Sequence, residues 1–335
     1  MTPRRRIVPV FVPHMGCPND CVFCNQRSIS GSPFPVTAEE TARLLQAAQS
    51  VADSAELAFY GGSFTAVPEE VQRALLEAAR PFRESGFISS VRVSTRPDAV
   101  SWEKLNFLKS HGVDTVELGA QSMDDRVLRL SGRGHRAEDT RRASELVKSA
   151  GMKLILQMMT GLPGSDPASD LETARALSAL TPDGVRIYPT VILRGTPLET
   201  MWRSGGYRAH TVRDAVECCW PIAALFQREK IPILRLGLNP TEDLSAGEAI
   251  AGAYHPALGE LVYGKLWLER ARAAFHALPR IPRRAAMLVP ENRVSVMTGQ
   301  RRCNLLALRR EFGLEELRVI GGQVPAETVA IREIL

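Results

Sequence analysis

The amino-acid sequence predicts an α/β protein, with a parallel sheet curled into a partial or full barrel followed by a small α+β domain. Short β-branched segments alternate with helix-length amphipathic segments over roughly the first 240 of the 335 residues. This alternation is typical of parallel sheets with right-handed crossovers. After Asn239-Pro240 the sequence changes to a Gly- and Ala-rich stretch, which predicts two domains at residues 1–245 and 246–335.

The first half of the predicted barrel begins with a buried strand that leads into a cysteine-containing loop. Thr37 and Glu40 form a capping-box pattern at the start of the first helix. The third strand ends at Arg96-Pro97. The expected strands cover residues 7–12, 56–60 and 91–94, and the expected helices cover residues 37–53, a segment after Pro68, and residues 102–111.

The second half of the predicted barrel continues the same alternation. Gly112 ends the helix at 102–111 and Gly151 ends the helix at 137–150, as glycine commonly does. The expected elements are strands at 115–118, 153–159, 185–188 and 233–238, and helices at 137–150, 170–180 and 211–230. Because the carboxyl ends of parallel strands meet at one edge of the sheet, we expect the functional residues to gather there.

Three cysteines lie in one short loop after the first strand, where Cys17, Cys21 and Cys24 form a C-x3-C-x2-C run. Thiolates are soft ligands that select zinc or iron–sulfur clusters. A four-iron cluster held by three cysteines has one iron open to a further ligand. A structural zinc instead needs a fourth protein ligand, for which His14 is nearest. A third alternative is that these thiols are buried and bind no metal.

The cysteine run, with Phe23 just before the last sulfur, resembles that of the radical S-adenosylmethionine (SAM) enzymes. The resemblance implies an open, TIM-like (β/α)6 barrel and a [4Fe–4S] cluster held by the three cysteines, with SAM chelating the open iron. It also implies an electron donor such as flavodoxin or ferredoxin. The implied reaction is reductive cleavage of SAM to a 5′-deoxyadenosyl radical, which abstracts hydrogen from the substrate.

Further motifs follow the strands in the order that this family shows. FYGGSFT resembles the motif that holds the SAM amino group, which assigns Gly61-Gly62-Ser63 to the cofactor, and Gln121 in VELGAQS matches a glutamine that helps to hold it. Ser94 departs from the pattern, since the family often has an acidic residue there. Glu117 has two interpretations, a residue of the cofactor site or a barrel residue hydrogen-bonded within the core.

Three later residues resemble cofactor contacts, and two more are substrate candidates. Arg133 matches an arginine that reaches the SAM carboxylate in relatives, and a guanidinium suits a two-pronged contact with a carboxylate. Gln157 occupies a position that often contacts the ribose hydroxyls, and Val191 would pack against the adenine. Arg96 and Tyr188 are the candidates for contact with substrate, Tyr188 as a hydrogen or proton partner. The alternatives are a solvated arginine at Arg133 and a core aromatic at Tyr188.

The strand motifs most resemble the catalytic subunit of Elongator, which modifies the wobble uridine of tRNA. Only about ninety residues follow the predicted barrel, so the resemblance does not extend to the acetyltransferase domain of that subunit, and acetyl-CoA use does not follow from it. The C-terminal domain is basic, which predicts a surface for tRNA phosphates; the alternative is a solvated helix face. Its arginine pairs are Arg283/Arg284, Arg301/Arg302 and Arg309/Arg310.

Two other function classes stay open from the sequence. One is radical SAM oxidation of a small molecule such as a tetrapyrrole, because the motifs also resemble the oxygen-independent coproporphyrinogen oxidases. Those enzymes have a fourth cysteine two residues after the third, where this chain has Gln26, so tRNA modification is favoured. The other class is a non-catalytic, metal-binding RNA-binding protein.

The other cysteines and the N-terminus bear on the compartment. Cys218 and Cys219 fall on the apolar stripe of the helix at 211–230 and are expected to pack in the core, while Cys303 is isolated. This distribution fits a reducing cytosol, so we expect a cytoplasmic protein. The apolar run after the N-terminal arginines is too short, and too broken by prolines, for a signal peptide. No stretch predicts a membrane span.

Overall fold

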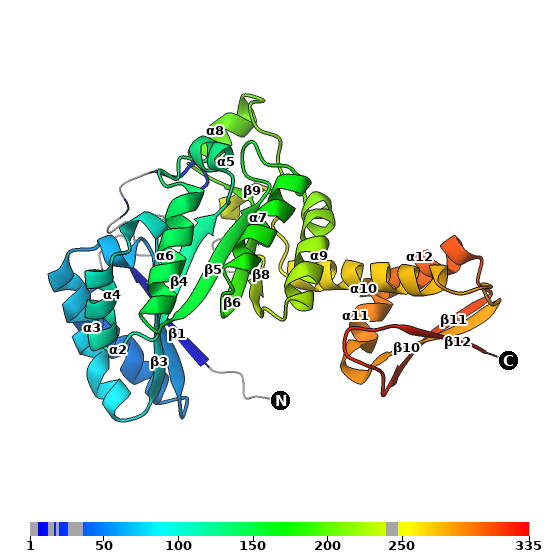
Figure 1. The fold of residues 1–335 in the computed structure, drawn as a ribbon, viewed down its shortest axis with the longest axis horizontal. Coiled ribbons are helices and arrows are strands. Elements are labelled where there is room, and N and C mark those ends of the chain that lie inside the picture. The colour runs from blue at the N-terminus through cyan, green and yellow to red at the C-terminus, as the bar shows by residue number, and fades with distance from the viewer. Residues whose placement is uncertain (1–5, 13–16, 18–19, 26–35, 239–246, 335) are drawn as a thin grey trace.

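The centre of the protein is a curled parallel sheet of seven strands (Figure 1). The computed structural model describes residues 6–12, 17, 20–25, 36–238 and 247–334. The sheet has the order β1-β2-β3-β4-β5-β6-β8, so the predicted α/β partial barrel is confirmed. Its strands are β1 (Arg6–Val12), β2 (Ala55–Gly61), β3 (Ile88–Thr95), β4 (Thr115–Gln121), β5 (Lys153–Thr160), β6 (Gly184–Pro189) and β8 (Ile233–Leu236).

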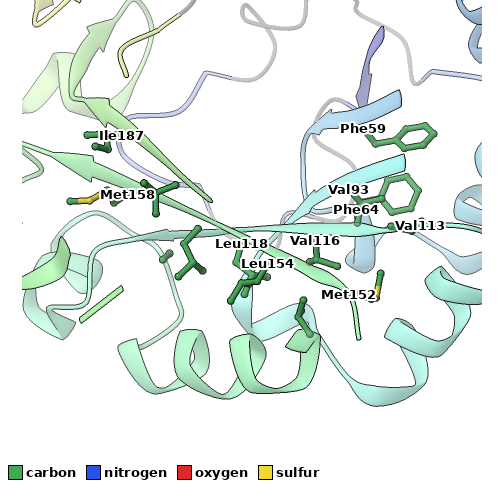
Figure 2. Close-up of a cluster of buried hydrophobic side chains, with 14 of the residues drawn as sticks. Phe59, Phe64, Val93, Val113, Val116, Leu118, Met152, Leu154, Met158 and Ile187 are labelled. Carbon is green, nitrogen blue, oxygen red and sulfur yellow. The ribbon is translucent and has the colours of Figure 1, made fainter. Parts of the chain in front are cut away.

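Helices cover the convex face of this sheet and bury alternate strand residues beneath them (Figure 1). Figure 2 shows side chains of β2 to β6, among them Val93, Leu118 and Met158, packed in this core. Each fully buried aliphatic side chain contributes about 1.5–3 kcal/mol to folding. The covering helices are α2 (Ala38–Gln49), α3 (Glu69–Glu84), α4 (Trp102–Ser110), α6 (Ala137–Ser149), α7 (Pro167–Ala179) and α9 (Val212–Arg228). The cap predicted at Thr37 is present, because its hydroxyl accepts a 3.1 Å hydrogen bond from the Glu40 N–H.

Cys218 and Cys219 lie on α9 and pack in the hydrophobic core of the barrel, as predicted, with relative exposures of 3% and 0%. The Cys218 thiol donates to the buried Asp170 carboxylate at 3.5 Å. Burial raises the pKa of Cys218, and it raises the pKa of Cys219 to about 12. Both therefore stay protonated and chemically inert.

Short elements near the carboxyl edge of the sheet are not among the sequence predictions. They are α5 (Asp125–Leu130), β7 (Val191–Leu193), α8 (Pro197–Arg203) and β9 (Ala249–Gly252). Strands β7 and β9 pair antiparallel and form a sheet of their own. Segments of three to seven residues are too short to show a hydrophobic period, so the sequence pattern does not reveal them.

The C-terminal domain is a three-stranded sheet packed against helices, as the α+β prediction states. Its strand order is β11-β10-β12, with β11 parallel and β12 antiparallel to β10. The elements are α10 (Leu258–His276), β10 (Arg284–Pro290), α11 (Val294–Thr298), α12 (Cys303–Phe312), β11 (Glu316–Gly322) and β12 (Ala330–Glu333). Two hydrophobic cores meet within α10, because Leu266 belongs to the barrel core and Trp267 to the C-terminal core. The domain boundary near residue 245 stays a prediction. No helix in the described part of the chain is long and apolar enough to cross a membrane.

Candidate active site

A cavity opens at the carboxyl ends of β2 to β5, next to the cysteine loop. The structure brings every predicted site residue to its lining except Tyr188 and Val191. The residues of this lining that the sequence prediction leaves without a definite role are Asp20, Ser94, Thr95, Glu117 and Gly119. The predicted gathering of functional residues at this edge of the sheet is thus present.

The three cysteines reach the cavity from one turn. The Cys24 N–H donates to the Cys21 carbonyl at 3.0 Å, and the Cys17 Sγ lies 3.5 Å from the Ser63 Oγ. Among the described residues, no three His, Cys, Asp or Glu side chains converge on one point as a single metal ion requires. In a four-iron cluster each cysteine binds a different iron, so the sulfurs need not converge. His14, the suggested fourth zinc ligand, lies outside the described residues.

The Gly61-Gly62 turn passes directly against the end of β1. Gly61 has a φ of +91°, and a Cβ there would lie 3.0 Å from the Val12 carbonyl oxygen. That oxygen accepts a 2.8 Å hydrogen bond from the Gly62 N–H. Only glycine fits this position without strain, and the turn therefore presents bare backbone to the cavity, as the sequence prediction requires.

Gln121 ends β4 in an unusual conformation. Its φ is +64°, and the pairing of β4 with β5 shifts register between Gly119 and Gln121. A non-glycine residue in this region costs on the order of 1–3 kcal/mol and is typical of functional sites. The side-chain oxygen of Gln121 accepts a 3.2 Å hydrogen bond from the Gln157 Nε2. The two predicted cofactor residues are therefore in direct contact.

Arg133 lies across the end of β4 and joins it to the cysteine loop. Its Nη2 donates to the Gly119 carbonyl at 2.6 Å, and its Nη1 lies 3.3 Å from the Cys21 Sγ. A Cβ on Gly119 would lie 2.9 Å from Gln121 Nε2 and 3.3 Å from Arg133 Nη2. Gly119 therefore leaves the space that both side chains need, a role that only the structure reveals.

Arg96 is buried and held by neighbouring groups. Its Nε and Nη2 donate to the two oxygens of Asp98 at 2.9 and 3.0 Å, and Nη2 also donates to the Arg133 carbonyl. Burial is the largest influence on the Asp98 pKa and raises it, but the hydrogen bond and charge of Arg96 outweigh it and leave this pKa lowered. Asp98 is therefore ionised and pairs with Arg96. The nearby His135 has its pKa lowered to about 4 by burial and by the Arg133 charge, so it is neutral.

Two guanidinium nitrogens in the cavity wall indicate what kind of ligand would fit there. Arg96 and Arg133 are 3% and 7% exposed. Arg96 Nη1 and Arg133 Nε are buried and have no hydrogen-bond partner among the described residues. A buried charged donor without an acceptor is costly, and a carboxylate is the kind of acceptor that pairs best with a guanidinium. The donor set therefore fits the amino-acid part of SAM.

A buried charge network fills the concave face of the sheet below the cavity. Glu117 lies 3.3 Å from Arg92 Nη1 and 3.0 Å from Arg186 Nε. Both interpretations of Glu117 therefore hold in part, since it lines the cavity and is paired within the barrel. The Tyr188 hydroxyl accepts a 3.2 Å hydrogen bond from Arg186 Nη1. Burial raises the pKa of Tyr188, which keeps it protonated.

Val191 and Tyr188, the two predicted site residues that do not line the cavity, lie in different surroundings. Tyr188 and Phe23 of the cysteine loop pack against the same small apolar cluster, but only Phe23 lines the cavity, so a contact of Tyr188 with substrate stays a prediction. Val191 is 5% exposed, and it pairs with Gly252 in the ladder between β7 and β9. Its contact with adenine stays a prediction.

Comparisons with known proteins agree with this architecture. Residues 11–177 match the model of the radical SAM superfamily, and residues 182–267 match the radical SAM C-terminal domain. The tRNA uridine(34) acetyltransferase of Methanocaldococcus infernus is 31% identical over 231 residues, which cover 63% of this chain and 42% of that protein. Elongator complex protein 3 of Mus musculus is 30% identical over 254 residues, covering 70% and 45%. The chain thus spans less than half the length of these two curated relatives.

Solved structures give the same picture. Archaeal Methanocaldococcus infernus Elp3 with an N-terminal deletion (1–46) superposes with a TM-score of 0.62 at 25% identity, covering 78% of this chain and 62% of that one. Coproporphyrinogen III oxidase (HemN) of Escherichia coli superposes with a TM-score of 0.50 at 16% identity, covering 68% and 54%. At that identity the second likeness shows the fold alone.

Proposed function

The chain belongs to the radical SAM superfamily and resembles its Elongator-like enzymes, and from this premise we propose that it cleaves SAM reductively at a [4Fe–4S] cluster and acts on tRNA. The observation that carries the proposal is a cavity lined both by three cysteines of one loop and by two arginines, each of which has a buried guanidinium nitrogen without an acceptor among the described residues. Tetrapyrrole oxidation has no such support, because the likeness to HemN is one of fold.

In this proposal Cys17, Cys21 and Cys24 hold the cluster. When bound, the cluster and SAM supply the 5′-deoxyadenosyl radical that removes hydrogen from a substrate. Arg133 lies 3.3 Å from the Cys21 Sγ, and its positive charge offsets the charge of a thiolate. The protein itself provides position and shelter from water.

Different residues of the cavity would contact different parts of SAM. The glycine turn and Ser63 offer backbone and hydroxyl groups to the amino end, and Arg133 offers its unpartnered Nε to the carboxylate. Gln121 and Gln157 are joined by a 3.2 Å hydrogen bond, and each retains amide groups for the ribose or adenine. Phe23 closes the side next to Cys24.

Support for tRNA as the substrate comes from the names of the relatives and from the C-terminal surface. In the described part of the chain, Arg283 lies 3.5 Å from Glu315, and Arg284 lies 2.6 Å from Glu316. Arg301 and Arg302 have no ion pair there and are exposed. We propose that this second pair contacts phosphates, and that a flavodoxin or ferredoxin delivers the electron.

The experiment is anaerobic reconstitution of the protein with iron and sulfide, followed by addition of dithionite and SAM. We expect a brown protein with three to four irons per chain, on the ligand count of such clusters, that forms 5′-deoxyadenosine. Cys24→Ala should lose the cluster and the product, while the matched control Cys303→Ala keeps both. A colourless protein that binds only zinc, or a Cys24→Ala protein that still makes 5′-deoxyadenosine, contradicts the proposal.

A further inference from the structure

Two tyrosines from distant strands meet at one arginine on the concave face of the sheet. Tyr60 lies on β2, whereas Arg186 and Tyr188 lie on β6, and three strands separate β2 from β6 in the sheet. Arg186 Nη2 donates to the Tyr60 hydroxyl at 2.7 Å, and its Cζ lies 5.2 Å from the centroid of the Tyr60 ring. This contact therefore crosses the interior of the curled sheet.

The direction of these hydrogen bonds leaves two hydroxyl protons available. A guanidinium can only donate, so the oxygens of Tyr60 and Tyr188 both accept from Arg186. Burial raises the pKa of both tyrosines, so each keeps its proton. In the part of the chain that the structure describes, no acceptor takes either proton. One arginine thus orients two hydroxyl groups whose protons have no acceptor among the described residues.

The two guanidinium groups nearest the network of these hydroxyls, Arg186 and Arg92, are each paired with a carboxylate. Glu117 pairs with both Arg186 and Arg92, and Arg92 also pairs with Glu56 through a 2.6 Å hydrogen bond from Nε. Two carboxylates therefore balance two guanidinium groups. Arg235, the next cation along the sheet, directs Nε and Nη2 to the carbonyls of Gly237 and Leu238.

This balance decides what kind of group the hydroxyls can bind. A phosphate or carboxylate would compete with Glu117 and Glu56 for guanidinium groups that are already paired and buried, at considerable cost. An uncharged oxygen acceptor, such as a carbonyl, adds no charge and satisfies the two donors. The site is therefore built for a neutral, carbonyl-bearing group.

The tyrosine pair also lies where a substrate would meet the cofactor. Tyr60 directly precedes Gly61 of the glycine turn, and Glu117, which holds Arg186, lines the cavity itself. Tyr188 packs in one apolar cluster with Phe23, next to Cys24. The two tyrosines do not line the cavity themselves, but each is linked to a residue that does, Tyr60 to Gly61 through the chain and Tyr188 to Phe23 through a shared apolar cluster.

We propose that Tyr60 and Tyr188 form a substrate-binding pair that donates hydrogen bonds to a neutral carbonyl of the substrate, such as that of a nucleobase. Arg186 is the positioning residue that holds both hydroxyls in place. This inference rests on the proposed function and deepens it, because it assigns recognition of the reacting base to the barrel and recognition of phosphates elsewhere. It also gives Tyr188 a binding role with a named partner, Tyr60.

The test uses the reconstituted protein and tRNA transcripts as the probe. Tyr60→Phe and Tyr188→Phe keep the rings and remove the donors, and Tyr263→Phe on α10, outside this network, is the matched control. We measure the transcript concentration and the SAM concentration that give half-maximal tRNA-stimulated formation of 5′-deoxyadenosine. Each Phe variant should raise the transcript value about 2- to 10-fold and shift the SAM value less than 2-fold. Tyr263→Phe should change neither.

A second substrate distinguishes contact with the carbonyl from loosening of the barrel. Transcripts made with 2-thiouridine or 4-thiouridine replace one base carbonyl with sulfur, a weaker acceptor. If the tyrosines contact that carbonyl, the unaltered protein should need a higher concentration of the thio transcript for half-maximal stimulation. The same sulfur substitution should add little to the already raised value of a Phe variant. The proposed tyrosine pair is overturned, without affecting the proposed function, by either of two results. One is that the effects of the Phe and sulfur substitutions on the half-maximal transcript concentration are fully additive for both thio transcripts. The other is that this concentration is unchanged in both Phe variants. Absence of any stimulation by tRNA in the unaltered protein overturns the proposed substrate as well.

Discussion

The arginines on the concave face of the barrel sheet are buried, whereas those on the edge of the C-terminal sheet are exposed. The side chains of Arg92 and Arg186 are 9% and 12% exposed and share Glu117, whereas those of Arg283 and Arg318 are 86% and 60% exposed. Exposed ion pairs contribute about 0–1 kcal/mol each. Removing one partner of a buried pair costs about 3–5 kcal/mol. The same residue type thus maintains the shape of the site in one domain and leaves charge available to solvent and ligands in the other.

Replacing Glu117 tests the buried side of this comparison most strongly. Glu117→Gln removes the charge that compensates Arg92 and Arg186, so we expect the free energy of unfolding to fall by about 3–5 kcal/mol. Urea unfolding followed by circular dichroism measures the loss. Glu316→Gln, which affects exposed pairs with Arg284 and Arg318, is the control and should change the free energy of unfolding far less. Equal losses in the two variants would show that burial does not distinguish the domains.

The pH dependence of stability should also arise in the barrel. Burial raises the pKa of Asp170 from 3.8 to about 6, so its contribution is present below pH 3.8 and is lost as the pH rises through 6. Burial and the Arg133 charge lower the pKa of His135 from 6.5 to about 4. Its contribution is present above pH 6.5 and is lost as the pH falls through 4. The two effects have opposite signs and each amounts to about 3 kcal/mol.

Single variants separate these two groups. As the pH falls from 6.5 to 4, we expect Asp170→Asn to lose about 3 kcal/mol of unfolding free energy relative to the unaltered protein, because only the His135 effect remains. His135→Gln should gain a similar amount over the same range. Urea titrations at several pH values measure both. Parallel curves for all three proteins would contradict the assignment.

Replacing Arg301 and Arg302, which have no ion pair in the described part of the chain, should have the smallest effect, and this effect is on tRNA affinity. Arg301→Ala with Arg302→Ala removes two exposed charges, so we expect tRNA affinity to fall about tenfold at low salt, and the slope of log affinity against log salt to decrease by about 1 to 2. Filter binding at several salt concentrations measures both quantities. Arg283→Ala, whose charge is paired with Glu315, should change the slope less. No binding by the unaltered protein at low salt would exclude this surface as an RNA site.

The sequence predicts features that depend on neighbouring residues. The cysteine spacing, the Gly61-Gly62 turn and the alternation of strands and helices are local patterns, and the structure contains each of them. Arg133 and Gln157 could be named as candidates because Gln157 lies in a recognisable strand and Arg133 lies in a Gly-Arg-Gly segment just before a helix. The predicted strands differ from the observed ones mainly at their ends, where β4 extends to Gln121 and β5 to Thr160.

The remaining features depend on how the sheet curls. The contact between Tyr60 and Arg186 joins residues 126 positions apart, and no local period indicates it. The left-handed conformation of Gln121 follows from a register shift between β4 and β5, and Gly119 is required only because two side chains from elsewhere lie over it. The sequence shows the residues but not these juxtapositions, because curvature and register are set by the whole sheet.

Helix α10 acts mechanically as a strut. It has 19 residues without a proline, which corresponds to a length of about 28 Å. One part is anchored in the barrel core and the other in the C-terminal core. A torque applied to the small sheet is therefore transmitted through the continuous hydrogen-bonded backbone of α10 and is not absorbed by a flexible joint. For the proposed contact of the C-terminal domain with tRNA, we therefore expect α10 to hold that domain and the barrel in one arrangement.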